Sequence, residues 1–185
     1  CVLMYALFFG YYPIIKASIE KIKIKPLVYI AKFLVFNACI TVAELISFYV
    51  FGIPFFDDGE FSSWLILAFA FMTYFNSGDK IYYPNITYSF YPVYSDLFDL
   101  KPETIPLNKN FEIETDDYKN LDSGIILANP NAPTSIALGR DQIEEIIAAS
   151  KDNIVIIDEA YIDFSGESVL QLTKKYDNLL VIQTF

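Results

Sequence analysis

Apolar residues are arranged differently in the two halves of the chain. Up to residue 56 they form two long runs, 1–15 and 27–56, with a lysine-rich stretch between them. From residue 80 onward, short apolar runs alternate with amphipathic stretches. A hydrophilic break at 57–63 separates these two patterns. The sequence therefore predicts two parts, a hydrophobic helical segment at 1–60 and an independent unit at 61–185.

The first part has the character of membrane helices. The stretch 27–51 reaches the roughly 20 apolar residues that a bilayer-spanning helix needs. Four lysines at 16–26 are typical of a cytoplasmic loop between two spans. We therefore expect a transmembrane hairpin within 1–56, unrelated in origin to the rest of the chain. The alternative is a pair of buried helices in a soluble core, which Glu44 favours because a carboxylate is costly inside a membrane.

The second part has the pattern of an α/β fold. Helices are expected at 64–75, 87–97, 141–150 and 168–176, the first of them buried. Strands are expected at 80–83, 104–107, 124–128, 154–157 and 179–182. The last three are continuous apolar runs rich in β-branched residues, which is typical of a parallel sheet covered on both faces. The predicted fold class is α/β with a parallel sheet.

Charge and composition exclude several kinds of function. The chain has 13 basic and 23 acidic residues, a net charge of −10, and all of this excess lies after residue 63. Sequence-independent binding of nucleic acid is excluded because phosphates are repelled by such a surface. There is no histidine and there are two cysteines, Cys1 and Cys39, so histidine-based catalysis and a thiolate zinc site are excluded as well. We expect no metal site.

Polar residues gather where the predicted strands end. The strand at 80–83 leads to Tyr88, the strand at 124–128 leads to Asn131, and the strand at 154–157 leads to Asp158 and Tyr161. Taken one by one, these are a packing tyrosine, a proline-bounded turn and a loop carboxylate. In a parallel sheet, however, the carboxyl ends of neighbouring strands meet at the edge where ligands bind. The four residues are therefore candidates for one site.

Three motifs together carry a family resemblance. They are Asn-Pro-Asn-Ala-Pro-Thr at 129–134, Ile-Asp-Glu-Ala-Tyr-Ile-Asp-Phe at 157–164, and Thr-Tyr-Ser-Phe-Tyr-Pro-Val-Tyr at 87–94. With Val-Ile-Gln-Thr-Phe at 181–185, they resemble histidinol-phosphate aminotransferases, which are pyridoxal 5′-phosphate enzymes of fold type I. The resemblance covers residues 65–185 and implies that 61–185 is part of the large domain of such an enzyme. It does not extend into residues 1–60.

The resemblance implies a role for each candidate residue. Asp158 is expected to hold the proton on the pyridine nitrogen, and Tyr161 to donate a hydrogen bond to the ring 3′-oxygen. Tyr88 is expected to lie against the cofactor ring or the substrate. The family usually has asparagine directly before Pro-Thr, where this chain has Ala132. Its neighbour Asn131, or a water molecule, is expected to supply that contact.

Two departures from the family lead us to expect no activity from the chain 1–185. The lysine that carries the cofactor in the family corresponds to a position about two residues beyond Phe185. The phosphate-binding step corresponds to 58–63, where Asp58 and Glu60 are expected to repel a phosphate. No catalytic residue is therefore assigned within this chain. The arginine that binds the substrate carboxylate and the small domain of the family also have no counterpart here.

The resemblance also implies a reaction and partners for the parent enzyme. The expected reaction is amino transfer between histidinol phosphate and 2-oxoglutarate, or its reverse with glutamate, in histidine biosynthesis. The expected location of the aminotransferase part is cytoplasmic, and the parent is expected to be a homodimer. Two alternatives remain open: a membrane protein with a non-catalytic domain of this fold, and another aminotransferase or decarboxylase of fold type I.

Overall fold

A computed structural model describes residues 60–183, together with residues 31, 34, 35 and 38. The chain separates into two units, Cys1–Phe61 and Ser62–Phe185, and the second is the one described below. The predicted membrane hairpin and the predicted phosphate step at 58–63 lie largely outside the described residues. Among the helices of the described part, none is both long and apolar enough to cross a bilayer.

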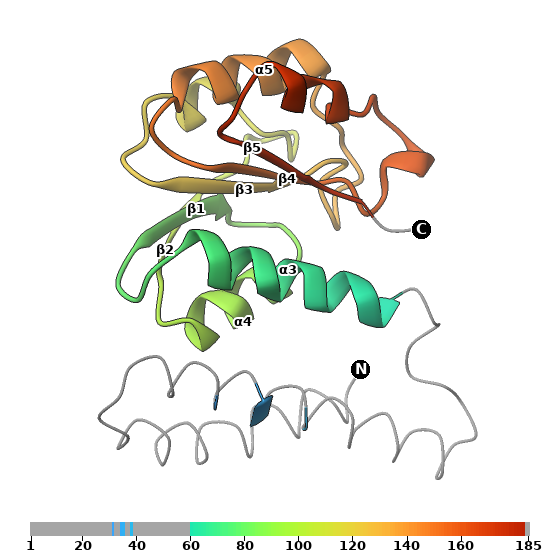
Figure 1. Ribbon diagram of the computed structural model, residues 1–185. Coiled ribbons are helices and arrows are strands. Elements are labelled where there is room, and N and C mark those ends of the chain that lie inside the picture. Colours follow the sequence, from blue (N-terminus) through green and yellow to red (C-terminus); the bar gives the residue numbers. More distant parts are fainter. Residues whose placement is uncertain (1–30, 32–33, 36–37, 39–59, 184–185) are drawn as a thin grey trace, which may run out of the picture. The chain divides into compact units, whose positions relative to one another are not determined.

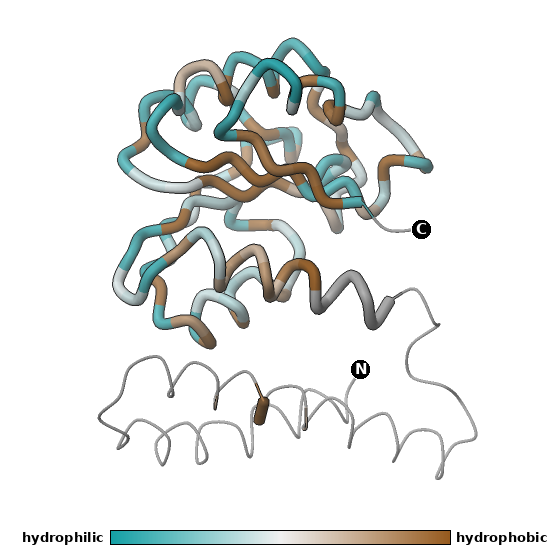
Figure 2. Tube along the Cα trace, viewed as in Figure 1, coloured by the Kyte–Doolittle hydropathy of each residue, from teal (hydrophilic) through white to brown (hydrophobic). Residues whose placement is uncertain are grey.

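Five parallel strands form a single sheet in the order β2-β1-β3-β4-β5 (Figure 1). The strands are β1 Lys80–Pro84, β2 Lys101–Ile105, β3 Gly124–Ala128, β4 Val155–Asp158 and β5 Leu179–Ile182. The central strand β3 is buried along its whole length, and the hydropathy of β3, β4 and β5 is correspondingly high (Figure 2). The predicted parallel α/β fold is confirmed.

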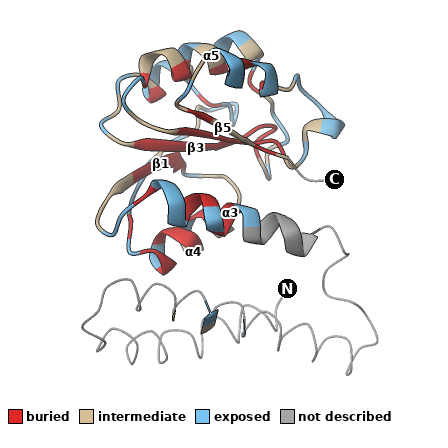
Figure 3. Ribbon diagram, viewed as in Figure 1, coloured by how far each residue is buried: buried red, intermediate tan, exposed pale blue. Residues whose placement is uncertain are grey.

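Helices cover both faces of this sheet. Helices α3 (Glu60–Tyr74) and α4 (Phe90–Leu97) lie on one face, and α5 (Arg140–Ala149) lies on the other (Figure 1). Successive residues of a strand point to opposite faces. Accordingly, Ile125 and Leu127 pack in the same buried cluster as Ile143 and Ile146 of α5. Figure 3 shows the buried side of α5 turned toward the sheet.

The expectation of a buried helix at 64–75 is correct for only one side of α3. Phe71 is fully buried against the aromatic residues of α4, with 5.3 Å between its ring centroid and that of Tyr94. Ile66, Phe69 and Met72 are exposed by 44%, 48% and 39%. The helix has apolar residues all around, but it packs on the sheet through one side, so a continuous apolar run did not mean complete burial.

Helix α3 begins four residues earlier than predicted, and three other predicted elements differ from the structure by more than one residue in their bounds. Strand β2 begins three residues before its predicted start and ends two residues before its predicted end, because it pairs in register with β1, Lys80 opposite Lys101. Its side chains are mostly exposed, so it lacks the apolar pattern of an inner strand. Helix α4 begins at Phe90 rather than at residue 87. The predicted helix at 168–176 is a short 3-10 helix, η3 (Leu170–Lys174); two more, η1 (Thr115–Tyr118) and η2 (Ile162–Phe164), complete the described elements.

Gly124 allows a close approach between β3 and the chain that follows α3. A Cβ at this position lies 2.5 Å from a ring carbon of Phe75 and 3.0 Å from the Ile154 side chain. We therefore expect Gly124→Ala to lower the free energy of unfolding by about 1–3 kcal/mol, because a packed core resists an added methyl group. Urea denaturation of the chain measures this loss. Phe75→Leu in the same chain is expected to recover part of it; equal stability of Gly124→Ala and the wild type contradicts the packing.

Candidate functional site

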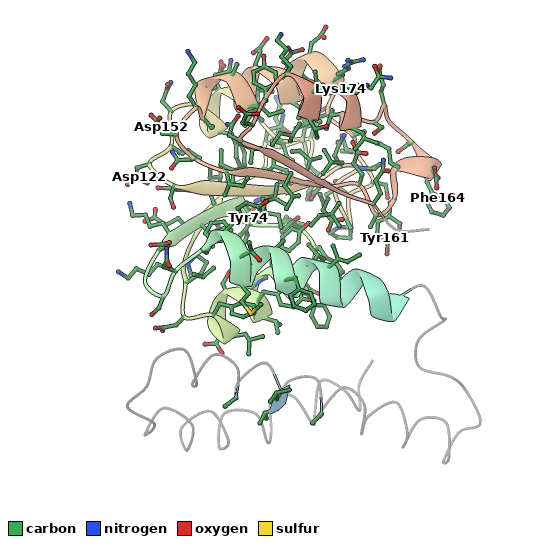
Figure 4. All side chains as sticks on the ribbon, in the orientation of Figure 1. Tyr74, Asp122, Asp152, Tyr161, Phe164 and Lys174 are labelled. Carbon is green, nitrogen blue, oxygen red and sulfur yellow. The ribbon has the colours of Figure 1, made fainter. Side chains whose placement is uncertain are left out.

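The carboxyl ends of β1, β3 and β4 meet at one edge of the sheet. Asp158 is the last residue of β4, and the segments that follow β1, β3 and β4 contain Tyr88, Asn131 and Tyr161. Figure 4 shows Tyr161 at this edge and Asp122, which precedes β3, at the opposite edge. The parallel arrangement of the strands therefore gathers residues as far apart in the sequence as Tyr88 and Tyr161, which are separated by 73 positions.

Asp158 is a buried carboxylate at the end of β4, with 5% of its surface exposed. Because side chains alternate along the strand, Asp158 shares the sheet face of Ile156 and meets α4. Its Oδ2 accepts a hydrogen bond of 2.9 Å from the Tyr91 hydroxyl, and its Oδ1 accepts one of 3.2 Å from the Ala160 N–H. Burial raises the pKa of the Asp158 carboxyl, and these two hydrogen bonds oppose that rise.

Tyr88 is connected to this carboxylate by Tyr91, which contacts both residues. The Tyr88 and Tyr91 rings meet edge to face, with centroids 5.6 Å apart and planes at 77°. Tyr91 is completely buried, and the pKa of its phenol is raised well above the usual value, first by burial and then by the nearby Asp158 charge. The phenol is therefore a neutral hydrogen-bond donor to Asp158. Tyr88 itself is half-buried beside it.

Asn131 holds two of the loops together. Its side chain is buried, and its Oδ1 accepts a 2.8 Å hydrogen bond from the Thr87 hydroxyl. Its Nδ2 donates to the Ile86 carbonyl at 2.9 Å and to the Thr134 hydroxyl at 3.3 Å. Both amide protons are therefore in use within the protein. A hydrogen bond from Asn131 to the cofactor, as expected from the sequence, would require one of these two contacts to break.

A cavity of about 330 Å³ opens between the loops after β3 and β4. This volume is at the lower end of the range of small-molecule sites, about 300–1,000 Å³. Asn131, Ala132, Tyr161 and Phe164 are among its lining residues. The Tyr161 side chain is 49% exposed and packs near Phe164, with ring centroids 6.1 Å apart. Two of the four candidates, Asn131 and Tyr161, therefore line this cavity. The other two, Asp158 and Tyr88, both contact Tyr91.

Glu159 is a second buried carboxylate, and sequence reasoning missed it. Its Oε1 accepts a 2.7 Å hydrogen bond from the Val169 N–H, and its Oε2 accepts 2.7 Å bonds from the Ser168 hydroxyl and the Gln183 amide. Its own N–H donates to the Ile182 carbonyl at 2.7 Å. Glu159 therefore fastens the loop after β4 to the end of β5. The only sequence signal was an acidic residue beside Asp158 at the end of an apolar strand.

Comparison with known proteins identifies the family to which this edge of the sheet belongs. The sequence profile of aminotransferase class I and II matches residues 62–185. The chain belongs to the class I and II aminotransferases. This family depends on pyridoxal 5′-phosphate, and the resemblance noted in the sequence is confirmed at this level.

Two curated relatives share the name histidinol-phosphate aminotransferase. The protein of Brachyspira hyodysenteriae is 71% identical over 121 residues, which are 65% of this chain and 34% of that protein. The protein of Acinetobacter baumannii is 52% identical over 119 residues, 64% of this chain and 33% of its own length. The chain thus spans about a third of the length of the curated relatives it matches.

A solved structure shows the same fold. The histidinol-phosphate aminotransferase of Clostridium acetobutylicum superposes with a TM-score of 0.59 at 23% identity, over 65% of this chain and 37% of that one.

The residues at the sheet edge suit the cofactor of the family. A carboxylate has about four lone-pair positions, and each oxygen of Asp158 accepts one described hydrogen bond. Acceptor capacity therefore remains for a positively charged N–H such as that of a protonated pyridine. The exposed phenol of Tyr161 and the aromatic face of Tyr88 provide a polar and a flat apolar contact of the kinds that a pyridoxal ring uses.

Proposed function

We propose that residues 62–185 are the cofactor-binding core of a histidinol-phosphate aminotransferase, which transfers an amino group between histidinol phosphate and 2-oxoglutarate. The 71% identity to the Brachyspira hyodysenteriae relative over this region is the observation that carries the proposal. The fold and the buried carboxylate at the end of β4 support it. The expected homodimer, the cytoplasmic location and the membrane hairpin stay predictions.

Asp158 and Tyr161 have complementary roles in this proposal. When bound, pyridoxal phosphate supplies a protonated pyridine ring that withdraws electrons from the substrate Cα. The ionised carboxylate of Asp158 would hold the proton on the ring nitrogen, because such a charge pair is favourable in a buried site. The phenol of Tyr161 would donate a hydrogen bond to the ring 3′-oxygen. Tyr88 would supply an apolar aromatic surface for the ring.

We assign to Asn131 a structural role in place of a hydrogen bond to the cofactor ring. Its amide protons already bind Ile86 and Thr134, so it lines the cavity without donating to the ring oxygen. By joining the loop at 85–88 to the turn at 129–134, it holds Tyr88 in place relative to β3. This assignment leaves Tyr161 as the proposed donor to the 3′-oxygen.

A chimeric enzyme tests the proposed function. The 121 matched residues of this chain replace the corresponding segment of the Brachyspira hyodysenteriae relative, which supplies the rest of the protein. We expect the chimera to transfer the amino group of histidinol phosphate to 2-oxoglutarate with kcat/KM within about tenfold of the parent. A folded chimera that retains pyridoxal phosphate but does not act on histidinol phosphate, or prefers another amino acid, contradicts the proposal.

A further inference from the structure

Tyr91 contacts two of the residues that are proposed to bind the cofactor, Asp158 and Tyr88. Its hydroxyl donates to Asp158 Oδ2 at 2.9 Å, and its ring meets the Tyr88 ring edge to face. Tyr88 and Asp158 are 70 positions apart in the sequence; Tyr88 lies in the loop between β1 and α4, and Asp158 is the last residue of β4. A single buried side chain therefore connects the residue proposed for the ring face with the residue proposed for the ring nitrogen.

The position of the Tyr91 ring is fixed by rigid elements. The ring centroid lies 6.0 Å from that of Tyr83 in β1 and 6.5 Å from that of Phe71 in α3. The main chain is held as well, since the Tyr91 N–H donates to the Tyr88 carbonyl and its carbonyl accepts from the Ser95 hydroxyl at 2.8 Å. The phenol is fully buried. It cannot turn away from Asp158 without opening the aromatic core.

The carboxylate of Asp158 is held at both of its oxygens. Tyr91 binds Oδ2, and the Ala160 N–H binds Oδ1. Two hydrogen bonds to different oxygens fix the plane of the carboxylate as well as its position. Ala160 lies only two residues after Asp158, so the hydrogen bond from Tyr91 is the one that comes from another part of the fold.

We propose that Tyr91 is a positioning residue of the cofactor site: its phenol fixes the Asp158 carboxylate while its ring sets the place of Tyr88. This inference rests on the proposed role of Asp158 and adds to it a residue that acts through Asp158 and does not itself contact the cofactor. The hydrogen bond from Tyr91 also favours the ionised carboxylate, which the buried environment disfavours.

The sign of the expected pH effect follows from these contacts. Tyr91 from α4 and the adjacent Glu159 are the titratable groups that act on Asp158, and Tyr88 and Tyr94 face Tyr91 in turn. The Tyr91 hydrogen bond lowers the pKa of Asp158, whereas burial and Glu159 raise it. Removing the hydroxyl therefore raises the pKa of Asp158. As the pH falls, the Asp158 carboxylate of the variant is protonated at a higher pH than that of the wild type. A ligand that needs the ionised carboxylate therefore loses its affinity for the variant at that higher pH.

Pyridoxamine 5′-phosphate is a suitable probe because its amine does not react with surface lysines. Calorimetry from acid to neutral pH measures the affinity of this probe for the full chain. Carbon-13 NMR of the free protein follows the titration of the Asp158 carboxyl. For Tyr91→Phe we expect the acid limit of binding, and the midpoint of the carboxyl titration, to move to a pH about 1 to 2 higher. Tyr118→Phe removes an equally buried hydroxyl from the cluster against α5 and is expected to leave both unchanged.

A second variant keeps the test decisive if Tyr91→Phe does not fold. Difluorotyrosine in place of Tyr91 keeps the ring and the hydroxyl but is a stronger hydrogen-bond donor, so the acid limit is expected to move to lower pH. Unchanged profiles in a folded Tyr91 variant overturn the positioning role. If the wild type binds no probe, or if Asp158→Asn binds it with the same pH profile as the wild type, the proposed function of Asp158 fails instead.

Discussion

Asp158→Asn is expected to reduce amino transfer by the chimeric enzyme on the order of 100-fold or more when the cofactor is saturating. Asparagine has the shape of aspartate and can still hydrogen-bond to a ring nitrogen. It carries no charge, however, and cannot keep a proton on that nitrogen. The buried position of Asp158 makes this difference large, because little water is present to replace the missing charge. Steady-state kinetics with histidinol phosphate measure the loss.

Asp163→Asn is the matched control for this experiment. Asp163 lies in η2, five residues further along the same loop region, and its side chain is exposed. The substitution removes the same charge without touching the buried site, so we expect kinetics close to those of the wild-type chimera. Equal activity of Asp158→Asn and Asp163→Asn contradicts the role assigned to Asp158.

Glu159→Ala is expected to lower the free energy of unfolding by about 2–4 kcal/mol. The substitution removes three hydrogen-bond acceptor contacts at once, those to Val169, Ser168 and Gln183. The Val169 N–H is left without its partner in a place where the residue is completely buried. Urea denaturation of the chain measures the loss. Hydrogen exchange at the Val169 amide is expected to accelerate, because the loop after β4 loses its fastening to β5.

Glu167→Ala serves as the control for Glu159→Ala. Glu167 lies in the same loop but is exposed, and its described contact is an ion pair of 3.3 Å with Arg140. Exposed ion pairs of this kind contribute less than about 1 kcal/mol, and the Val169 amide is not involved. If the two variants lose the same amount of stability, Glu159 does not have the fastening role that the structure assigns to it.

The inner strands of the sheet could be predicted from the sequence because burial on both faces leaves a clear apolar run. Strand β3 occupies the predicted residues, and β4 and β5 differ from prediction by at most one residue. Strand β2 could not be placed, since its position depends on pairing with β1 and its side chains face solvent. The helix predicted at 168–176 is only the short η3, which begins at Leu170. Tertiary contacts again decide the bounds, because Glu159 accepts hydrogen bonds from Ser168 and Val169 and holds these two residues in a loop.

The candidate site was predictable in its location but not in its connections. The ends of apolar strands marked Asn131, Asp158 and Tyr161, because parallel strands bring those ends together. The link through Tyr91 depends on which face of the sheet Asp158 occupies and on how α4 packs there. The hydrogen bonds of Asn131 likewise depend on the path of the loop at 86–87. Neither is encoded in local sequence, so the expected donor role of Asn131 could not be judged beforehand.

Nitrogen-15 NMR of ring-labelled pyridoxamine 5′-phosphate bound to the chain tests the central claim most directly. The chemical shift of the ring nitrogen reports whether that atom carries a proton. With the wild-type chain at neutral pH we expect a protonated nitrogen, because the ionised carboxylate of Asp158 holds the proton there. With Asp158→Asn we expect an unprotonated one. An unprotonated ring nitrogen in the wild type, or the same protonation state in both proteins, contradicts the assignment of Asp158.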